Sequence, residues 1–347
     1  MVRKKVAVAM SGGVDSSVTA ALLKQQGYDV FGLTMDLFPP GENGSVAARD
    51  ARHVAECLDI PHHLIDCRDF FQDEVIKYFC AEYHVGRTPN PCVRCNALLK
   101  FGHLFAKARE FGADYLATGH YARIATVDGE AALCKGTDHH KDQSYFLFVL
   151  KRENLDRILF PLGEYKKSEV RQLAAQFALP VHEKPESQDI CFVPDGDHVG
   201  FIEARMQERG EPGPLVHVSG KILGKHRGIY CYTIGQRRGL GVGWSEPLYV
   251  VEIDAEQNRV VVGERHHLLK RELLAGRLNW LISEPSQPFV AKCRIRYRHR
   301  ETEAEITPFP GGRVQVNFAE PQQGITPGQA AVFFADDRVL GGGWIEA

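Results

Sequence analysis

The chain has 347 residues, of which 44% are hydrophobic and 25% charged, so it is too long for one ordinary domain and has the composition of a soluble globular protein. No apolar stretch approaches the length of about 18 residues that a membrane-spanning helix needs, so we expect no membrane contact and a cytoplasmic protein whose nine cysteines are reduced. The 42 basic and 44 acidic residues exclude a general attraction to nucleic acid, and any RNA contact must come from local patches.

A glycine-rich loop follows the first apolar run of the chain. Residues 5–10 predict a strand, Ser11-Gly12-Gly13-Val14-Asp15-Ser16-Ser17 a tight turn, and residues 17–26 a helix. The glycines let the backbone approach a ligand, and the amides at the helix start, with the hydroxyls of Ser11, Ser16 and Ser17, favour an anion. No Gly-Lys-Ser/Thr follows, so the loop is not a Walker loop and instead resembles the PP-loop of the ATP pyrophosphatases. The alternative is a glycine-rich turn before a core helix.

Short apolar strands alternate with helical patterns over the first half of the chain. Strands are predicted at 6–10, 30–35, 63–66 and 115–118, which indicates an α/β fold with a parallel sheet. Ligands of such sheets bind beyond the carboxyl ends of the strands, so we expect ATP there, with Mg²⁺ on the carboxylate of Asp15. The residues predicted to contact ATP are Ala9, Met10, Ser11, Gly12, Gly13, Val14, Asp15, Ser16, Met35 and Gly119.

Two cysteines stand three residues apart in the segment Thr88-Pro89-Asn90-Pro91-Cys92-Val93-Arg94-Cys95-Asn96. Asn90 is predicted to cap a helix whose first residue is Pro91. Both thiols then lie on one face near the helix start, where the dipole favours thiolate, so we expect activated cysteines. Structural zinc would need a second Cys-x-x-Cys pair, which the sequence lacks, and core packing is the other alternative.

The second half of the chain, from about residue 211, is rich in glycine, proline and β-forming runs, such as 248–253, 259–262 and 331–334, and is predicted to be all-β. Within it, Lys292, Arg294, Arg296, Arg298 and Arg300 alternate along the sequence. On a strand they would form a cationic ridge about 26 Å long that could follow RNA phosphates. The alternative is an edge strand protected by charge. The adjacent His139 and His140 are interpreted as part of a solvated loop.

Several less common motifs accompany the phosphate loop in a fixed order. They are Asn90-Pro91-x-x-x-Cys95-Asn96, Ala117-Thr118-Gly119-His120-Tyr121, Lys141-Asp142-Gln143-Ser144-Tyr145, Ser187-Gln188-Asp189-Ile190-Cys191-Phe192, Tyr232-Thr233-Ile234-Gly235-Gln236-Arg237 and Thr326-Pro327-Gly328-Gln329. Together they resemble the family of tRNA-specific 2-thiouridylases over almost the whole chain. The resemblance implies a Rossmann-like PP-loop domain at residues 1–205, a small central β-rich domain at 206–270 and a C-terminal β-barrel at 271–347. It also implies that AMP is transferred to the C2 oxygen of the wobble uridine, which sulfur then replaces.

The resemblance gives catalytic roles to the cysteines. Cys191 would carry a persulfide delivered by a sulfur-relay protein or a cysteine desulfurase, and Cys95 would attack it and close a disulfide with Cys191. The pattern most familiar in the family has aspartate where this chain has Cys92. The departure leaves a second route open, in which Cys92, Cys95 and Cys191 hold a [4Fe-4S] cluster with one open iron.

The resemblance further implies contacts with the anticodon stem-loop of tRNA. Asn90, Pro91 and Cys92 would line the pocket of the target base, and the residues implied to face the RNA are His120, Lys141, Asp142, Gln143, Arg296, Tyr297 and Gln329. Two other classes remain as alternatives. A PP-loop ligase acting on a small molecule would need no cysteine pair, and a non-catalytic RNA- or metal-binding protein would need no intact phosphate loop.

Overall fold

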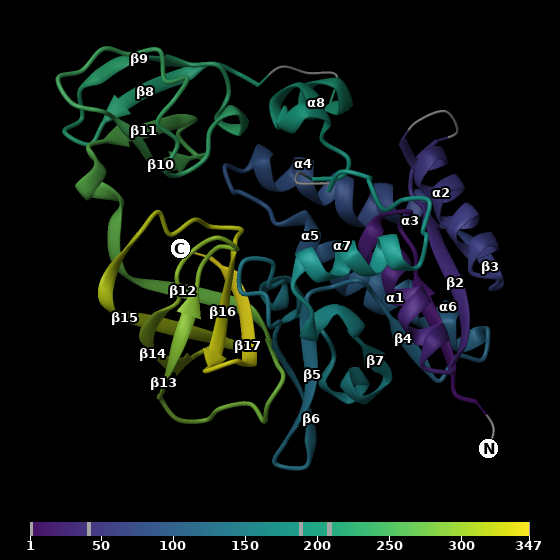
Figure 1. Cartoon of the computed structure of the whole chain (residues 1–347). Helices are drawn as coiled ribbons and strands as arrows, with labels where there is room; N and C mark the ends of the chain where they lie inside the picture. The colour runs from purple at the N-terminus through teal and green to yellow at the C-terminus, as the bar shows by residue number, and fades with distance from the viewer. Residues whose placement is uncertain (1–2, 40–42, 187–189, 207–209, 347) are drawn as a thin grey trace.

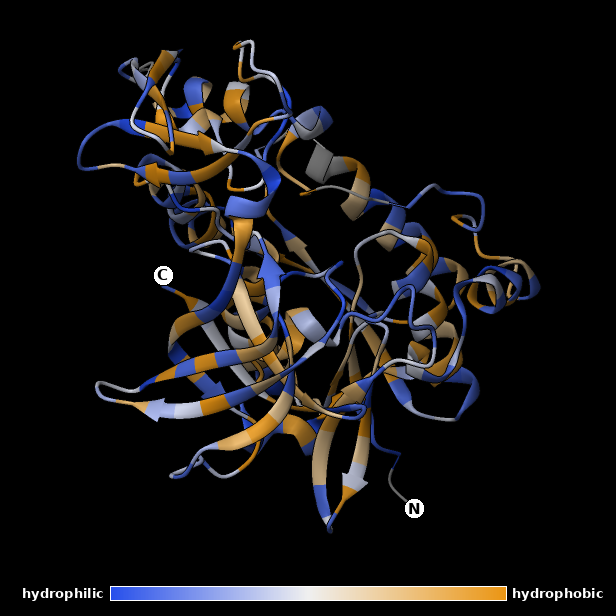
Figure 2. Ribbon diagram, turned by 90° about the vertical axis from the view of Figure 1, so that its left-hand side faces the viewer, coloured by the Kyte–Doolittle hydropathy of each residue, from blue (hydrophilic) through white to orange (hydrophobic). Residues whose placement is uncertain are grey.

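The structure, a computed structural model, describes residues 3–39, 43–186, 190–206 and 210–346. It has an N-terminal α/β part, a small central sheet and a C-terminal barrel (Figure 1), which confirms the predicted fold class. Hydrophobic residues gather along the strands and the inner faces of the helices, and the loops are mostly polar (Figure 2). Ser187, Gln188 and Asp189, part of one sequence motif, lie outside the described residues.

Five parallel strands form the N-terminal sheet in the order β3-β2-β1-β4-β7. They are β1 (Lys5–Ala9), β2 (Asp29–Asp36), β3 (His62–Asp66), β4 (Tyr115–Ala117) and β7 (Ile158–Leu159). The central residues of β1 and β2 are buried, as expected for a sheet covered by helices on both faces. The four predicted strands are confirmed, whereas β7, with two residues, is too short to leave a pattern in the sequence.

Helices surround this sheet, except that the last of them in the chain lies beside the central sheet (Figure 1). They are α1 (Val14–Gln25), α2 (Asn43–Cys57), α3 (Arg68–Phe71), α4 (Lys77–His84), α5 (Pro91–Cys95), α6 (Phe105–Glu110), α7 (Lys167–Gln176) and α8 (His198–Met206). Two π-helical segments, η1 (Gln72–Ile76) and η2 (Asn96–Leu104), join α3 to α4 and α5 to α6. Among the residues that the structure describes, no helix combines the length and apolar character needed to cross a bilayer.

The C-terminal barrel closes because its first strand pairs at both edges. Its strands are β12 (Leu269–Trp280), β13 (Phe289–Arg294), β14 (Thr302–Phe309), β15 (Arg313–Gln323), β16 (Ala330–Ala335) and β17 (Arg338–Ile345). β12 pairs antiparallel with β15 on one side and β17 on the other. Alternate residues of β15 are buried, which is the period expected for a strand with one face in a core.

A hairpin of the N-terminal half extends the sheet of the barrel. It consists of β5 (Ala122–Val127) and β6 (Glu130–Lys135), and β6 pairs with β17 at Cys134 and Arg338. Its turn residues, Asp128 and Gly129, both have positive φ, as in the Asp-Gly turns typical of tight hairpins. The two parts also share a core in which Phe148 packs in one cluster with Val332 and Phe334. The hairpin thus fixes the barrel against the α/β part.

The central sheet has the order β10-β11-β8-β9. Its strands are β8 (Gly213–His217), β9 (Ile222–His226), β10 (Tyr249–Asp254) and β11 (Arg259–Gly263). Val250 and Val260 of this sheet share a hydrophobic cluster with Phe71 and Phe79 of the N-terminal helices. The all-β character predicted for the second half of the chain is therefore confirmed, with α8 as the helix that leads into it.

Candidate functional site

The glycine-rich loop lies where β1 ends and α1 begins. Gly12 has φ of +68°, and a side chain there would collide with the backbone oxygen of Ala47. Gly119, just after β4, packs so closely that a Cβ would lie 2.8 Å from the carbonyl carbon of Asp15. Both positions therefore require glycine, and the fold brings the predicted residues Ser11 to Asp15 together with Gly119.

The hydroxyl groups of this loop serve the loop itself. Ser17 is fully buried and donates to the carbonyl of Gly13 over 2.8 Å, and the Ser16 hydroxyl donates to the same carbonyl over 3.2 Å. The Ser16 hydroxyl also accepts the Ser11 amide over 3.1 Å. The expectation that all three hydroxyls point toward an anion is thus wrong for Ser17, whose helical position turns it toward the preceding turn.

Two lysines that the sequence analysis missed complete the loop. Lys167, at the start of α7, donates to both carboxylate oxygens of Asp15 over 2.7 and 2.8 Å, and Tyr121 donates to one of them over 2.9 Å. Lys184 donates to the carbonyl of Gly12 over 3.0 Å and to Asp50 over 2.5 Å. These positive charges come from segments far along the chain, and no local pattern connects them with the loop.

The partners of Asp15 bear on the predicted Mg²⁺ site. Mg²⁺ needs carboxylate oxygens that are free to enter an octahedral shell. Both carboxylate oxygens of Asp15 already accept hydrogen bonds from Lys167, and one of them also accepts a hydrogen bond from Tyr121. Asp15 therefore does not fit the ion as a direct ligand, and its observed role is to hold an ammonium group beside the phosphate loop.

The cysteine segment is a short helix held from the barrel side. Asn90 caps α5 as predicted, since its side chain accepts the amide of Val93 over 3.2 Å. The side-chain amide of Gln329 donates to the carbonyls of Thr88 and Pro89 over 3.0 and 3.1 Å. The amide of Thr88 donates to the carbonyl of Pro327 over 2.9 Å. The loop before β16 thus shapes the segment that presents the cysteines.

The three cysteines form one electrostatic group. Burial raises the pKa of Cys92 to about 11 and that of Cys191 to about 12, and burial likewise raises the pKa of Cys95. The charge of a neighbouring thiolate adds to the rise at Cys92 and Cys191. The expected activated thiolates are therefore not found in the protein alone, because the loss of hydration outweighs the helix dipole. Cys92 and Cys191 are nevertheless exposed to solvent, so a reactant can reach them.

Lys100 faces this group and was also missed by the sequence analysis. It lies five residues after Cys95 in η2, and the wide turn of a π-helix brings residues five apart onto nearly the same face. Its positive charge opposes the rise in pKa at all three cysteines. No ion pair of Lys100 is found within the described ranges, so its charge stays available to a nearby anion.

Most residues implied to face tRNA have partners inside the protein. Asp142 is buried and accepts from Ser144 over 2.9 Å and Arg294 over 3.1 Å, so a direct RNA contact is wrong for it. His120 is buried beside Thr118, which corrects its expected place at the surface. The internal partners of the others are Glu186 for Lys141, the Tyr121 amide for Gln143, the Gln323 carbonyl for Arg296 and the Phe146 ring for Tyr297.

The cationic ridge predicted at 292–300 is wrong as a strand. β13 ends at Arg294, which pairs with Asp142 and Glu301 over 3.1 and 2.5 Å. Burial lowers the pKa of Arg296, whose guanidinium donates to a backbone carbonyl. Arg298 and Arg300 are exposed, and Arg300 and Lys292 line a polar hollow next to Arg294 and His299. The alternating charges therefore divide between internal ion pairs and a smaller exposed cationic surface.

Comparisons with known proteins cover the whole chain. Residues 4–195 match a family described as tRNA methyl transferase HUP domain, residues 199–264 its PRC-barrel domain and residues 270–345 an aminomethyltransferase beta-barrel domain. The tRNA-specific 2-thiouridylase MnmA of Syntrophotalea carbinolica is 54% identical over 99% of this chain and 98% of that protein. The protein of the same name from Moorella thermoacetica is 49% identical over 98% of this chain and 99% of its own length.

A solved structure, the U34-tRNA thiolase NcsA from Methanococcus maripaludis with its [4Fe-4S] cluster, is 20% identical to this chain. The match has a TM-score of 0.38 and covers 60% of this chain and 67% of that one.

Proposed function

The chain belongs to the family of tRNA-specific 2-thiouridylases, and we propose that it replaces the C2 oxygen of the wobble uridine by sulfur through Cys191 and Cys95. It is an enzyme that thiolates tRNA at the expense of ATP. The observation that carries this function is the 54% identity over 99% of the chain. The alternatives of a small-molecule ligase and of a non-catalytic binding protein are not favoured.

We propose that the phosphates of ATP bind at Gly12, Gly13 and the first turn of α1, whose amides point along the helix axis. AMP is transferred to the C2 oxygen of uracil, which turns a poor leaving group into a good one and releases pyrophosphate. Lys167 and Lys184 supply positive charge beside the departing pyrophosphate. In this proposal Mg²⁺ enters the site bound to the phosphates of ATP, because the carboxylate of Asp15 is paired with Lys167.

Sulfur transfer then follows as two displacements. The terminal sulfur of a Cys191 persulfide attacks C2, a C–S bond forms, and AMP leaves with the former carbonyl oxygen. The Cys95 thiolate next attacks the Cys191 sulfur, which forms a Cys95–Cys191 disulfide and leaves the sulfur on the base as thiocarbonyl. A dithiol reductant restores both thiols, and a persulfide-carrying relay protein or desulfurase recharges Cys191. The close electrostatic coupling of the two thiols supports this pairing.

The alternative route through a [4Fe-4S] cluster depends on Cys92 as a third cysteine ligand. Cys92, Cys95 and Cys191 would supply three thiolates to a [4Fe-4S] cluster with one iron left open, and such a cluster would bind hydrosulfide as the sulfur source. We favour the persulfide route, because Cys95 and Cys191 alone suffice for it.

The test uses protein purified without oxygen. Under the persulfide route Cys92→Asp retains most single-turnover thiolation of tRNA, whereas Cys95→Ser and Cys191→Ser abolish it and still release pyrophosphate. Iron near four per chain, with thiolation lost on chelation and in Cys92→Asp, would overturn this route in favour of the cluster. ADP in place of AMP would overturn the proposed adenylation itself.

A further inference from the structure

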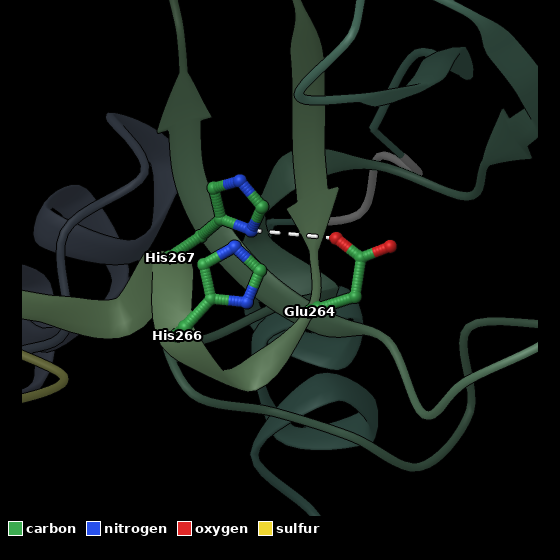
Figure 3. A group of neighbouring side chains, drawn as sticks. All are labelled: Glu264, His266 and His267. Atoms are coloured by element: carbon green, nitrogen blue, oxygen red, sulfur yellow. Dashed lines mark ion pairs between the residues drawn. The ribbon is translucent and has the colours of Figure 1, made fainter.

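A second constellation of ligating side chains lies outside the catalytic site, where the central sheet leads into the barrel. β11 ends at Gly263, Glu264 precedes the 3-10 helix η8 (Arg265–Leu268), and β12 follows directly. The backbone carbonyl of Glu264 accepts the amide of His267 over 3.0 Å, so the two residues belong to one turn of the chain. One donor atom from each of Glu264, His266 and His267 lies within 4.8 Å of the other two (Figure 3).

The distance between the ligating atoms of Glu264 and His267 fits two ligands of one metal ion better than it fits a hydrogen bond. His267 Nδ1 is buried and has no hydrogen-bond partner among the described residues, yet it lies 3.4 Å from Glu264 Oε2. Zinc bonds to nitrogen and oxygen are about 2.1 Å long, and two ligands on a tetrahedral ion are then about 3.4 Å apart. A nitrogen left unpaired at this distance from a carboxylate oxygen is the arrangement expected of two ligands that share an ion.

Neighbouring side chains hold the carboxylate in place. The indole of Trp244 donates to Glu264 Oε1 over 3.0 Å, which leaves Oε2 directed toward His267. His217 Nε2 lies 3.3 Å from Oε2, and the His217 ring stacks on Trp244 with centroids 4.6 Å apart. The other ring nitrogen of His217 accepts the amide of Ser219 over 3.2 Å. Partners that orient a ligand in this way are typical of metal sites and raise their affinity.

From this geometry we propose that Glu264, His266 and His267 bind one Zn²⁺ ion, with water in the fourth position. Two imidazoles and one carboxylate suit zinc and not Mg²⁺ or Ca²⁺, which prefer oxygen ligands throughout. The site shares no residue with the phosphate loop or the cysteines. Its role is structural, because it fixes the connection between β11 and β12 to His217 at the end of β8 and to Trp244 in the loop before β10.

The test compares full-length wild-type protein with Glu264→Gln and His267→Ala after removal of metals by a chelator. Zn²⁺ binding is measured by competition with a chromophoric chelator, and melting temperature is measured with and without Zn²⁺. The matched control is His139→Ala with His140→Ala, another pair of adjacent histidines, both of which are exposed. Because the free cysteines also bind zinc, the quantity compared is the difference in stoichiometry between variants.

Wild type and the control pair should bind one Zn²⁺ more than either variant, or bind that ion at least tenfold more tightly. Zn²⁺ should raise the melting temperature of wild type and of the control pair more than that of Glu264→Gln, an isosteric change that keeps an acceptor for Trp244. Cobalt should give ligand-field bands that are lost in His267→Ala. Equal stoichiometry and affinity in wild type and both variants would overturn the proposal.

Discussion

Cys191 should react slowly with an alkylating reagent although it is exposed. Its pKa is raised from 9.0 to about 12, first by burial and then by the charges of Cys95 and Cys92. At pH 8 this shift of about three units lowers the thiolate fraction about 1000-fold relative to an ordinary thiol. A thiolate of higher pKa is intrinsically more nucleophilic, by about 20-fold for a shift of this size. The net expectation is alkylation about 50-fold slower than that of an ordinary exposed cysteine.

The assay is iodoacetamide labelling at several pH values, followed by mass spectrometry of the peptide that contains each cysteine. Cys57 is exposed and lies in the same chain, so it serves as an internal control for access. Because the pKa of Cys191 is raised, its rate should climb about tenfold per pH unit from pH 7 to pH 10 without a plateau. A Cys191 rate within threefold of the Cys57 rate at pH 8, or a plateau below pH 9, would refute the reasoning.

Three further predictions concern the phosphate loop, the barrel contact and the RNA surface. Lys167→Met should lower AMP release at least about 100-fold while Lys151→Met, at an exposed position, leaves it unchanged; a loss below threefold would contradict the role of Lys167. Gln329→Leu should lower the free energy of unfolding in urea by about 1–2 kcal/mol, since two carbonyls lose their donor, and an unshifted midpoint would count against this. Neutralising Arg298 and Arg300 together should reduce the salt dependence of tRNA binding by about two units of slope, and an unchanged slope would exclude phosphate contacts there.

The features that were predicted correctly from the sequence depend on residues close together in the chain. The strand, turn and helix around Gly12 and the cap at Asn90 depend on residues a few positions apart, and the structure confirms both. The pair of Lys167 and Asp15 spans 152 residues, and nothing in either segment signals the other. The low acidity of Cys191 likewise depends on burial among segments that meet only in the fold.

The prediction of a single strand at 292–300 was wrong for a different reason. Alternation is a sound indication of a strand only when side chains on one face meet solvent and those on the other meet a core. Here Arg294 turns to Asp142 and Glu301, and Tyr297 packs on Phe146, so tertiary partners end the strand. The Asp128-Gly129 turn, in contrast, is a standard indication of a β-hairpin, and it could have predicted the hairpin of β5 and β6 from the sequence.

The hairpin of β5 and β6 has a consequence for how the chain becomes folded during synthesis. Lys135, at the end of β6, pairs with Glu301 over 2.7 Å and donates to the carbonyl of Asp336, which is 201 residues later in the chain. On the ribosome, β6 therefore emerges long before β17, its neighbour in the sheet, and its edge stays open until the barrel has been translated. The edge of β6 that pairs with β17 is therefore protected only once the last strand of the chain has been made.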